Sequence, residues 1–360
     1  MIDRTAPVAP TARKIQGVLP WLFLLAGVLY ASGGNDYVLS VASLIVVWSL
    51  LAFSLNFLIG YAGLVNLGIG AFYAFGAYAA ARLSVDGSHV TPVLILLGVP
   101  LAGFVIGAII GLPILRTTGL HFATATLAVA MIVTDVTNNW TQATKGPIGV
   151  AGVYRPGKLG PLDPTTNQGF FFFAVIVLVL MILAATLYHR SRVARVLTAS
   201  RDDAMLTSSL GFELTGYKVT GFATSAAAGA LAGVMYAWLI QYVSPAPFAF
   251  FAASFPAFVL VAVGGPGSVW GPVIGACFLQ GLPQVLGIQG NSRDIVYGVI
   301  LLLCIAFLPG GVGPTLGHWT RLGLTALLGR RGQEGATPDP TPPAAMAAAA
   351  SKHADPIETP

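Results

Sequence analysis

The chain has 360 residues, of which 56% are hydrophobic and only 9% are charged, and its formal net charge is +5. Ordinary soluble domains carry about 25% charged residues, so the composition excludes a water-soluble fold and predicts an all-α integral membrane protein. The 18 basic residues punctuate apolar runs and do not line one face, which argues against nucleic acid as a partner.

Runs of about 20 mostly apolar residues predict membrane-spanning helices. We expect a polytopic helical bundle of about ten spans, with eight as the lower bound. In chain order the expected spans are 18–33, 38–59, 62–83, 90–115, 117–137, 169–188, 218–239, 249–264, 268–287 and 294–309.

The distribution of basic residues predicts the orientation of these spans. With the N-terminus inside, 13 of the 18 lysines and arginines fall in the cytoplasm, and the outer five are Arg82, Lys145, Arg155, Lys158 and Arg293. We therefore expect both termini in the cytoplasm. Residues 1–17 form a short N-terminal segment, 18–310 the transmembrane domain, and 311–360 a largely disordered tail without a periodic apolar face. The first span is expected to be an anchor, since no signal-peptide cleavage site follows it.

Two long polar connections separate the spans. The outer one, 138–168, is rich in Gly, Pro, Thr and Asn, and we expect a loop there. The inner one, 190–217, mixes dense charge with a helix-like apolar pattern, and we expect a short amphipathic helix. A solvated loop is the alternative interpretation. The residues that stand out in this inner segment are Arg195, Arg201, Asp202, Asp203 and Gly211.

The sequence contains no recognisable catalytic, metal-binding or cofactor-binding constellation. Its five histidines are scattered, and Cys277 and Cys304 lie separately in apolar runs. Residues 152–158 match Gly-x4-Gly-Lys, but Leu159 replaces the hydroxyl residue that a nucleotide-binding loop needs, and no strand is expected before it. Asp135 is the one acid inside a predicted span, where either an interfacial or a functional role is open. We therefore expect no enzyme, no metal and no cofactor.

Glycines recur at every fourth position in three spans, which places them on one helix face and predicts close helix packing. The sets are Gly103, Gly107 and Gly111; Gly229 and Gly233; and Gly271 and Gly275. Small residues dominate 221–237, so this helix is expected to be surrounded by other helices.

Two other glycine segments, 60–70 and 264–272, interrupt the helices. Unwound backbone at membrane depth occurs where it is buried or lines a cavity, and paired breaks in transporters mark solute sites. Two short cytoplasmic turns are the alternative. A path lined by such breaks would favour a carboxylate-bearing solute. The candidate path residues are Asn56, Gly60, Tyr61, Gly63, Asn66, Gly68, Gly264, Gly265, Gly267 and Ser268.

Three blocks resemble the branched-chain amino acid ABC transporter permeases of the LivM type. Residues 54–68, with the Gly-Tyr-Ala-Gly run at 60–63, resemble the N-terminal signature of that family. Residues 191–211 resemble its cytoplasmic coupling segment, and 264–276 resemble its C-terminal block. The three blocks occur in the family's order between about residues 40 and 310.

The resemblance implies a multi-pass permease subunit in the inner (plasma) membrane of a bacterium, which imports leucine, isoleucine, valine or a related amino-acid-like solute. The implied partners are a second homologous permease, two cytoplasmic ATP-binding subunits that hydrolyse ATP, and an extracytoplasmic solute-binding protein. In that case the segment 190–217 would couple to the ATPase through the five residues named above.

Two alternatives remain. Asn66 stands where the family commonly has Ser, and Ala194 and Ser200 also depart from its coupling pattern. An ABC permease for urea or short amides would look similar. An ion-coupled secondary transporter is the other alternative, but it would be expected to carry more mid-membrane acids than Asp135.

Overall fold

The computed structural model describes residues 21, 26–29, 33–85, 91–117, 119–157, 163–285 and 298–299. The helices are α2 Asp36–Ala62, α3 Ile69–Val85, α4 Pro92–Ile114, α5 Leu120–Asn139, α6 Thr141–Thr144, α7 Asn167–Arg190, α8 Arg192–Asp202, α9 Ala204–Ser209, α10 Leu214–Ile240, α11 Phe255–Gly264 and α12 Gly271–Val285. Short 3-10 turns η1 Gly146–Ile148 and η2 Ala246–Phe248, the π-helical turn η3 Phe250–Ser254 and an antiparallel pair of strands, β1 Val150–Ala151 and β2 Tyr242–Val243, complete the described chain.

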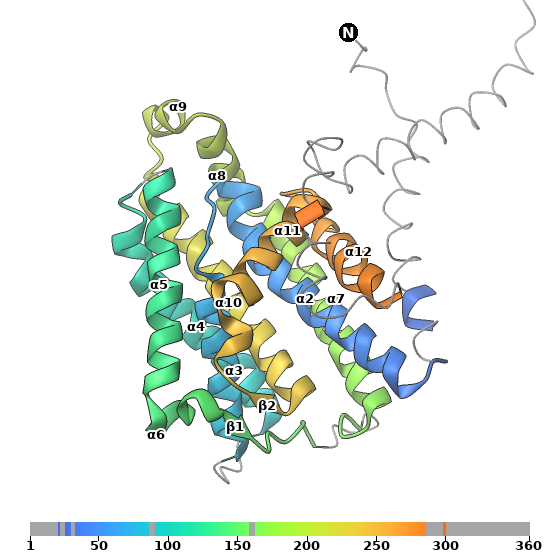
Figure 1. Cartoon of the computed structure of the whole chain (residues 1–360). Helices are drawn as coiled ribbons and strands as arrows, with labels where there is room; N and C mark the ends of the chain where they lie inside the picture. Colours follow the sequence, from blue (N-terminus) through green and yellow to red (C-terminus); the bar gives the residue numbers. More distant parts are fainter. Residues whose placement is uncertain are drawn as a thin grey trace, which may run out of the picture.

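Figure 1 shows these helices packed side by side in one bundle, with α8 and α9 at one end and α6, β1 and β2 at the other. Eight of the ten expected spans coincide with a helix of this bundle. Five helices are long and apolar enough to cross a membrane, namely α2, α4, α5, α7 and α10. The all-α membrane fold is therefore confirmed for the described residues, whereas the number of ten spans and the side of each terminus stay predictions.

Several expectations fall outside the described residues. They are the N-terminal segment 1–17, most of the first and last expected spans (18–33 and 294–309), and the tail 311–360.

Helix α10 is the centre of the bundle and packs against α2, α3 and α4. Glycine makes these close approaches possible. A Cβ added at Gly103 of α4 would lie 2.8 Å from Cβ of Ala230, and one added at Gly233 of α10 would collide with the carbonyl of Tyr73 on α3. Real Cβ atoms do not approach neighbours that closely. The predicted glycine packing faces, and the enclosure of the small-residue helix, are confirmed.

Between α2 and α3 the chain turns back into the bundle before it becomes helical again (Figure 1). Gly63 ends α2 with a left-handed φ of 68°, and residues 63–68 are non-helical. The backbone N–H of Leu67 donates to Oγ1 of Thr126, well inside α5, at 3.1 Å. The expected start of a span at residue 62 was therefore wrong, because a non-helical segment, in which Asn66 and Gly68 are buried, separates the two helices.

The second half of the bundle repeats this arrangement in the opposite direction. The long helix α10 ends beside β2 at the end opposite α8, and residues 241–249 lead back toward α3 before η3 and α11 begin (Figure 1). Phe248 packs edge-on against Tyr73, with ring centroids 5.1 Å apart, and the N–H of Gly70 donates to Oγ of Ser254 at 3.0 Å. The beginnings of α3 and of the η3–α11 segment thus meet inside the bundle.

One local expectation about the outer loop was wrong. The strand β1 stands directly before Gly152, where no strand was expected. It pairs antiparallel with β2, and the described residues after it, 152–157, are not helical. The surroundings therefore still differ from those of a nucleotide-binding loop, which leads from a strand into a helix.

Candidate functional site

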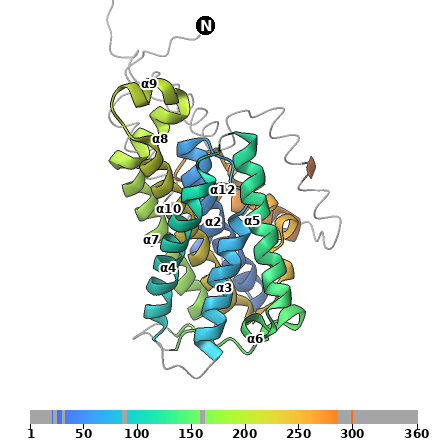
Figure 2. The ribbon, with the colours of Figure 1, turned by 90° about the vertical axis from the view of Figure 1, so that its left-hand side faces the viewer.

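The charged segment between α7 and α10 folds into α8 and α9, which lie together at one end of the bundle in both views (Figures 1 and 2). Oγ of Ser191 accepts the N–H of Ala194 at the start of α8, and the Asp203 carboxylate accepts the N–H of Leu206 at the start of α9. A single helix was expected here. Two form because Asp203 is extended and caps a new first turn. Gly211, with φ 84°, follows the end of α9.

One face of α8 is buried against α2, α7 and α10. Ala194, Val196 and Leu197 form this face, and Leu197 is fully buried. Arg195 and Asp202, by contrast, are exposed. The helix is therefore amphipathic as expected, with its apolar side on the bundle and part of its charge available to a partner.

Arg201 fastens α8 to the end of α2. Its Nη1 donates to the carbonyl oxygen of Gly60 at 2.8 Å. Its aliphatic stem runs along Gly63, where an added Cβ would lie 2.9 Å from Cγ of Arg201. The Gly60 carbonyl is in the last turn of α2, where carbonyls lack helical partners and a cation is favourable. Arg201 thus supplies a hydrogen-bond donor to a carbonyl oxygen at the end of α2 that has no donor within its own helix.

Asn56 joins the same end of α2 to the linker between α11 and α12. Its Oδ1 accepts the N–H of Gly267 at 2.8 Å, and its Nδ2 donates to the carbonyl of Ser268 at 2.9 Å. A Cβ added at Gly60 would lie 2.5 Å from the Gly267 nitrogen. The two glycine segments, 211 residues apart between Asn56 and Gly267, therefore touch directly.

These contacts bring six predicted site residues into one cluster, which we call the α8 junction. Its members are Asn56, Gly60, Gly63, Arg201, Gly267 and Ser268.

The other predicted site residues lie elsewhere. Asn66 is buried inside the bundle, where its Oδ1 accepts the N–H of Gly68 at 2.9 Å and its Nδ2 has no hydrogen-bond partner among the described residues. Gly68 lies against the backbone of Thr126. Tyr61 packs edge-on against Tyr188 of α7. Gly264 and Gly265 form the turn that ends α11, and Gly265 has φ 96°.

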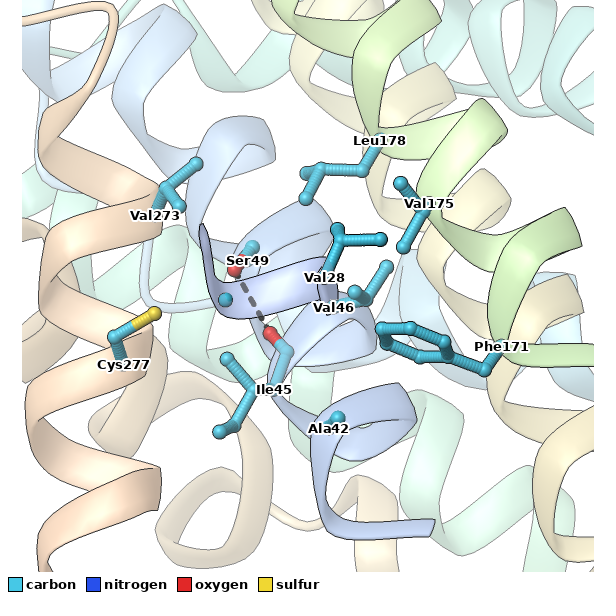
Figure 3. A pocket seen from close by; sticks show the side chains of 11 residues that line it. Val28, Ala42, Ile45, Val46, Ser49, Phe171, Val175, Leu178, Val273 and Cys277 are labelled. Atoms are coloured by element: carbon cyan, nitrogen blue, oxygen red, sulfur yellow. Dashed lines mark hydrogen bonds between the residues drawn. The ribbon is translucent and has the colours of Figure 1, made fainter. Parts of the chain in front are cut away.

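Two cavities in the described bundle contain none of the predicted site residues. The first, of about 140 Å³, lies between α2, α7 and α12 (Figure 3). Its lining is apolar apart from Ser49, whose hydroxyl already donates to the carbonyl of Ile45 at 2.8 Å. The second, of about 320 Å³, lies between α3, α4 and α5 and is also predominantly apolar. Hydrocarbon linings of this kind do not match the charged groups of an amino acid.

Arg155 was expected only to lie outside the membrane, and its structural role was missed. Its Nη1 donates to Oδ1 of Asn167 at 2.9 Å and its Nε to the carbonyl of Trp238 at 3.3 Å. The guanidinium also lies over the ring of Phe170, 5.0 Å from its centroid. Burial lowers the pKa of Arg155. A lone arginine in a Gly- and Pro-rich loop carries no local signal for such a role.

No group of three or more His, Cys, Asp or Glu side chains that could hold a metal ion occurs among the described residues.

Comparison with known proteins agrees with this architecture. The family model described as "Branched-chain amino acid transport system / permease component" matches residues 37–308. The chain is 29% identical over 299 residues to the high-affinity branched-chain amino acid transport system permease protein LivM of Salmonella typhimurium, which covers 76% of this chain and 69% of that protein. It is 28% identical over 299 residues to LivM of Escherichia coli K12, with the same coverage.

A shorter match, 31% identical over 126 residues, links it to the branched-chain amino acid permease protein BraD of Pseudomonas aeruginosa and covers 34% of this chain and 40% of that protein. No solved structure matches the chain. The matched range of the family model runs from the first turn of α2 to beyond α12, and the chain therefore belongs to the family of branched-chain amino acid transport system permease components.

Proposed function

We propose that this chain is the membrane-spanning permease subunit of an ABC importer for leucine, isoleucine, valine or a closely related amino-acid-like solute. It acts in the inner membrane of a bacterium, together with a second homologous permease and an extracytoplasmic solute-binding protein. Two cytoplasmic ATP-binding subunits hydrolyse the ATP, so this chain catalyses no reaction. Membership of the permease family supports the proposal.

The charge distribution supports a cytoplasmic position for the α8 end of the bundle. Among the described residues, six basic side chains lie at that end: Arg116, Arg190, Arg192, Arg195, Arg201 and Lys218. Three lie at the other end: Arg82, Lys145 and Arg155. Cytoplasmic segments carry the excess of Lys and Arg in membrane proteins.

The outer surface of α9 supports a docking role for the α8–α9 segment. Met205 is 82% exposed and Leu206 61% in α9, and Leu210, directly after that helix, is 70% exposed, so this end of the bundle presents three large apolar side chains to its surroundings. Exposed apolar patches of this kind mark protein interaction sites. We assign this surface, with Arg195 and Asp202 beside it, to the ATP-binding subunit.

The observation that carries the proposed mechanism is the hydrogen bond from Arg201 to Gly60. When the ATP-binding subunits close, α8 is displaced, and Arg201 transmits that displacement to the end of α2. Asn56 passes it on to the α11–α12 linker. In this proposal the α8 junction moves the cytoplasmic mouth of the solute path. Tyr61, Asn66, Gly68, Gly264 and Gly265 flank this moving region.

Uptake measurements test the solute assignment. In a strain lacking this gene, uptake of radiolabelled leucine, isoleucine and valine should fall and should be restored by a plasmid copy. Urea and acetamide are measured in parallel, since an amide permease is the alternative. Normal uptake of all three amino acids in the deletion strain would contradict the assignment, and a selective loss of amide uptake would replace it.

A further inference from the structure

The larger of the two cavities, of about 320 Å³, is a groove between α3, α4 and α5, which we call the α3 groove. Helices α4 and α5 both pack against α3 but hardly against each other, so α3 forms the floor and the other two helices form the walls (Figure 2). Two of its lining residues, Val136 and Trp140, are 44% and 57% exposed. Because α4 and α5 are long and apolar enough to cross a membrane, the groove opens toward lipid.

Hydrocarbon side chains cover most of the α3 groove. They include Phe72 and Phe75 of α3, Ile106 and Ile110 of α4, and Val129 and Val133 of α5. Water finds no hydrogen-bond partners on such a lining, and apolar cavities of this kind stay dry. An empty groove would leave the lining side chains without atoms to contact. Hydrocarbon is the occupant that restores these contacts.

The end of the groove that lies away from α8 has a different character. Arg82, in the last turn of α3, lines this end, and its Nε and Nη2 donate to the carbonyl oxygens of Ala143 and Gln142. Trp140 lies at the same end, and the exposed Lys145 directly follows α6. Indole rings and basic side chains are the groups that proteins place at the level of lipid headgroups. The α3 groove therefore begins at the membrane interface.

The length of the groove matches one leaflet. Along α5 it extends from Trp140 to Val129, near the middle of the helix, and eleven residues at the helical rise of 1.5 Å span about 16 Å. Half of the hydrocarbon core of a bilayer is about 15 Å thick. An apolar cavity of about 150 Å³ takes up benzene, so the α3 groove has room for a longer hydrocarbon chain. A partner helix would cross the whole core, whereas this groove ends halfway.

We propose that the α3 groove holds one acyl chain of a membrane phospholipid, whose phosphate lies against Arg82 and Lys145. The chain fills the space between α4 and α5 and joins both helices to the floor on α3. The negative phosphate complements the positive charges at the mouth of the groove. The site depends on the membrane-spanning helices alone, so it holds whichever solute the protein carries.

Photochemical crosslinking tests the acyl site. The complete transporter is reconstituted in vesicles that contain phosphatidylglycerol with a diazirine group near the end of one acyl chain, and crosslinked residues are identified by mass spectrometry. Phe75, on the floor of the groove, should be labelled as well as Leu101, which lies on the exposed side of α4 and reports contact with bulk lipid. Label on Leu101 without label on Phe75 would show that protein closes the groove, and would overturn the proposal.

A pair of neighbouring substitutions tests occupancy of the same space. Val133→Trp places an indole in the groove and should abolish labelling of Phe75, while Leu101 stays labelled. Ile132→Trp is the matched control, because Ile132 is 60% exposed and does not line the groove, and Phe75 should be labelled as in the wild type. Equal labelling of Phe75 in V133W and I132W would overturn the proposal. The wild-type measurement decides even where V133W does not assemble.

Lys145→Gln tests the phosphate contact. At limiting amounts of the phosphatidylglycerol probe, the loss of one basic side chain at the headgroup should lower labelling of Phe75 by about fivefold. Arg190→Gln removes an exposed charge at the opposite end of the bundle and should leave the labelling unchanged. Unchanged labelling in K145Q, or an equal decrease in R190Q, would overturn the phosphate contact.

Discussion

At the scale of single residues, glycine is required where two backbones meet. Gly60 lies inside α2, but its missing side chain leaves room for the α11–α12 linker. The neighbouring Asn56 forms two hydrogen bonds with that linker, one accepted by its amide oxygen and one donated by its amide nitrogen. From the sequence, Gly60 was expected to begin a helix break. The structure shows instead that the helix continues through Gly60 and that the residue serves a contact across the bundle.

Gly60→Ala should therefore destabilise the protein. The new Cβ would lie 2.5 Å from the Gly267 nitrogen and 2.7 Å from Oδ1 of Asn56, so the linker must move and the Asn56 hydrogen bonds must lengthen. Overpacking of this kind costs about 1–3 kcal/mol. Thermal unfolding of the purified protein in detergent measures the loss.

Gly216→Ala is the matched control for this substitution. Nothing lies within 4 Å of a Cβ added there, and Gly216 is in α10. Since Ala has the higher helix propensity, G216A should hold or raise the unfolding temperature, with a gain of up to about 1 kcal/mol. A G60A variant as stable as G216A would show that the Gly60 contact with Gly267 is not required.

At the scale of elements, the amphipathic pattern correctly predicted a helix in the charged segment 190–217. The predicted ATPase contact of Arg201 stays a prediction, and the structure adds a contact within the bundle, since the guanidinium donates to the last turn of α2. A contact between positions 141 residues apart has no local sequence signal. We propose that Arg201 also positions α8 on α2.

Arg201→Ala should uncouple transport from ATP hydrolysis. Because the buried face of α8 still packs on the bundle, the complex of two permeases and two ATP-binding subunits should assemble. Solute uptake per ATP hydrolysed should fall by about tenfold, consistent with the loss of one charge-assisted hydrogen bond of roughly 1.5–3 kcal/mol. Reconstituted vesicles that report both uptake and phosphate release measure this ratio.

Arg190→Ala removes a neighbouring exposed charge at the end of α7 and serves as the control. Its ratio of uptake to ATP hydrolysis should stay within about twofold of the wild type, since isolated surface charges contribute little. A normal ratio in R201A, or loss of the ATP-binding subunits from the complex, would contradict the positioning role.

The breaks between long helices were predicted only in part. Residues 60–70 and 264–272 were expected as breaks in corresponding halves, and the structure brings these two segments together at the α8 end. By its place after a long helix, however, the counterpart of 63–68 is 241–249. The expected spans 218–239 and 249–264 leave this connection between them, but its correspondence to 60–70 was not predicted, because its left-handed residue is Gln241 and not glycine. The prolines Pro245 and Pro247 within it were an available signal.

At the scale of the whole molecule, polar contacts between residues far apart in the chain join neighbouring elements at both ends of the bundle. The α8 junction joins helices at one end, and Arg155 does so at the other, where it joins the loop before α7 to the start of α7 and the end of α10. The carbonyls of Trp238 and Leu239 that it contacts belong to the last turn of α10 and lack helical partners.

Arg155→Ala should loosen the end opposite α8. The loss of a half-buried guanidinium with its hydrogen bonds and its ring contact should cost about 1–3 kcal/mol. Hydrogen exchange of the backbone amides in β1, β2 and the start of α7 should increase, while exchange around α8 should not change. Arg155→Lys should recover only part of the protection, because one ammonium does not reproduce the fork of donors. Unchanged exchange in R155A would contradict this role.

The sequence by itself determined the membrane class, the approximate positions of eight helices of the bundle, the glycine packing faces and the charged segment between α7 and α10. These properties depend on composition and on periodicity within one helix, so they can be read from neighbouring residues. Only the tertiary structure decided that Gly60 meets Gly267, that Arg201 bonds to α2, that residues 63–68 return into the bundle, and which face of α5 is exposed. Each of these depends on which helices pack together, and that choice is made by contacts between residues far apart in the chain.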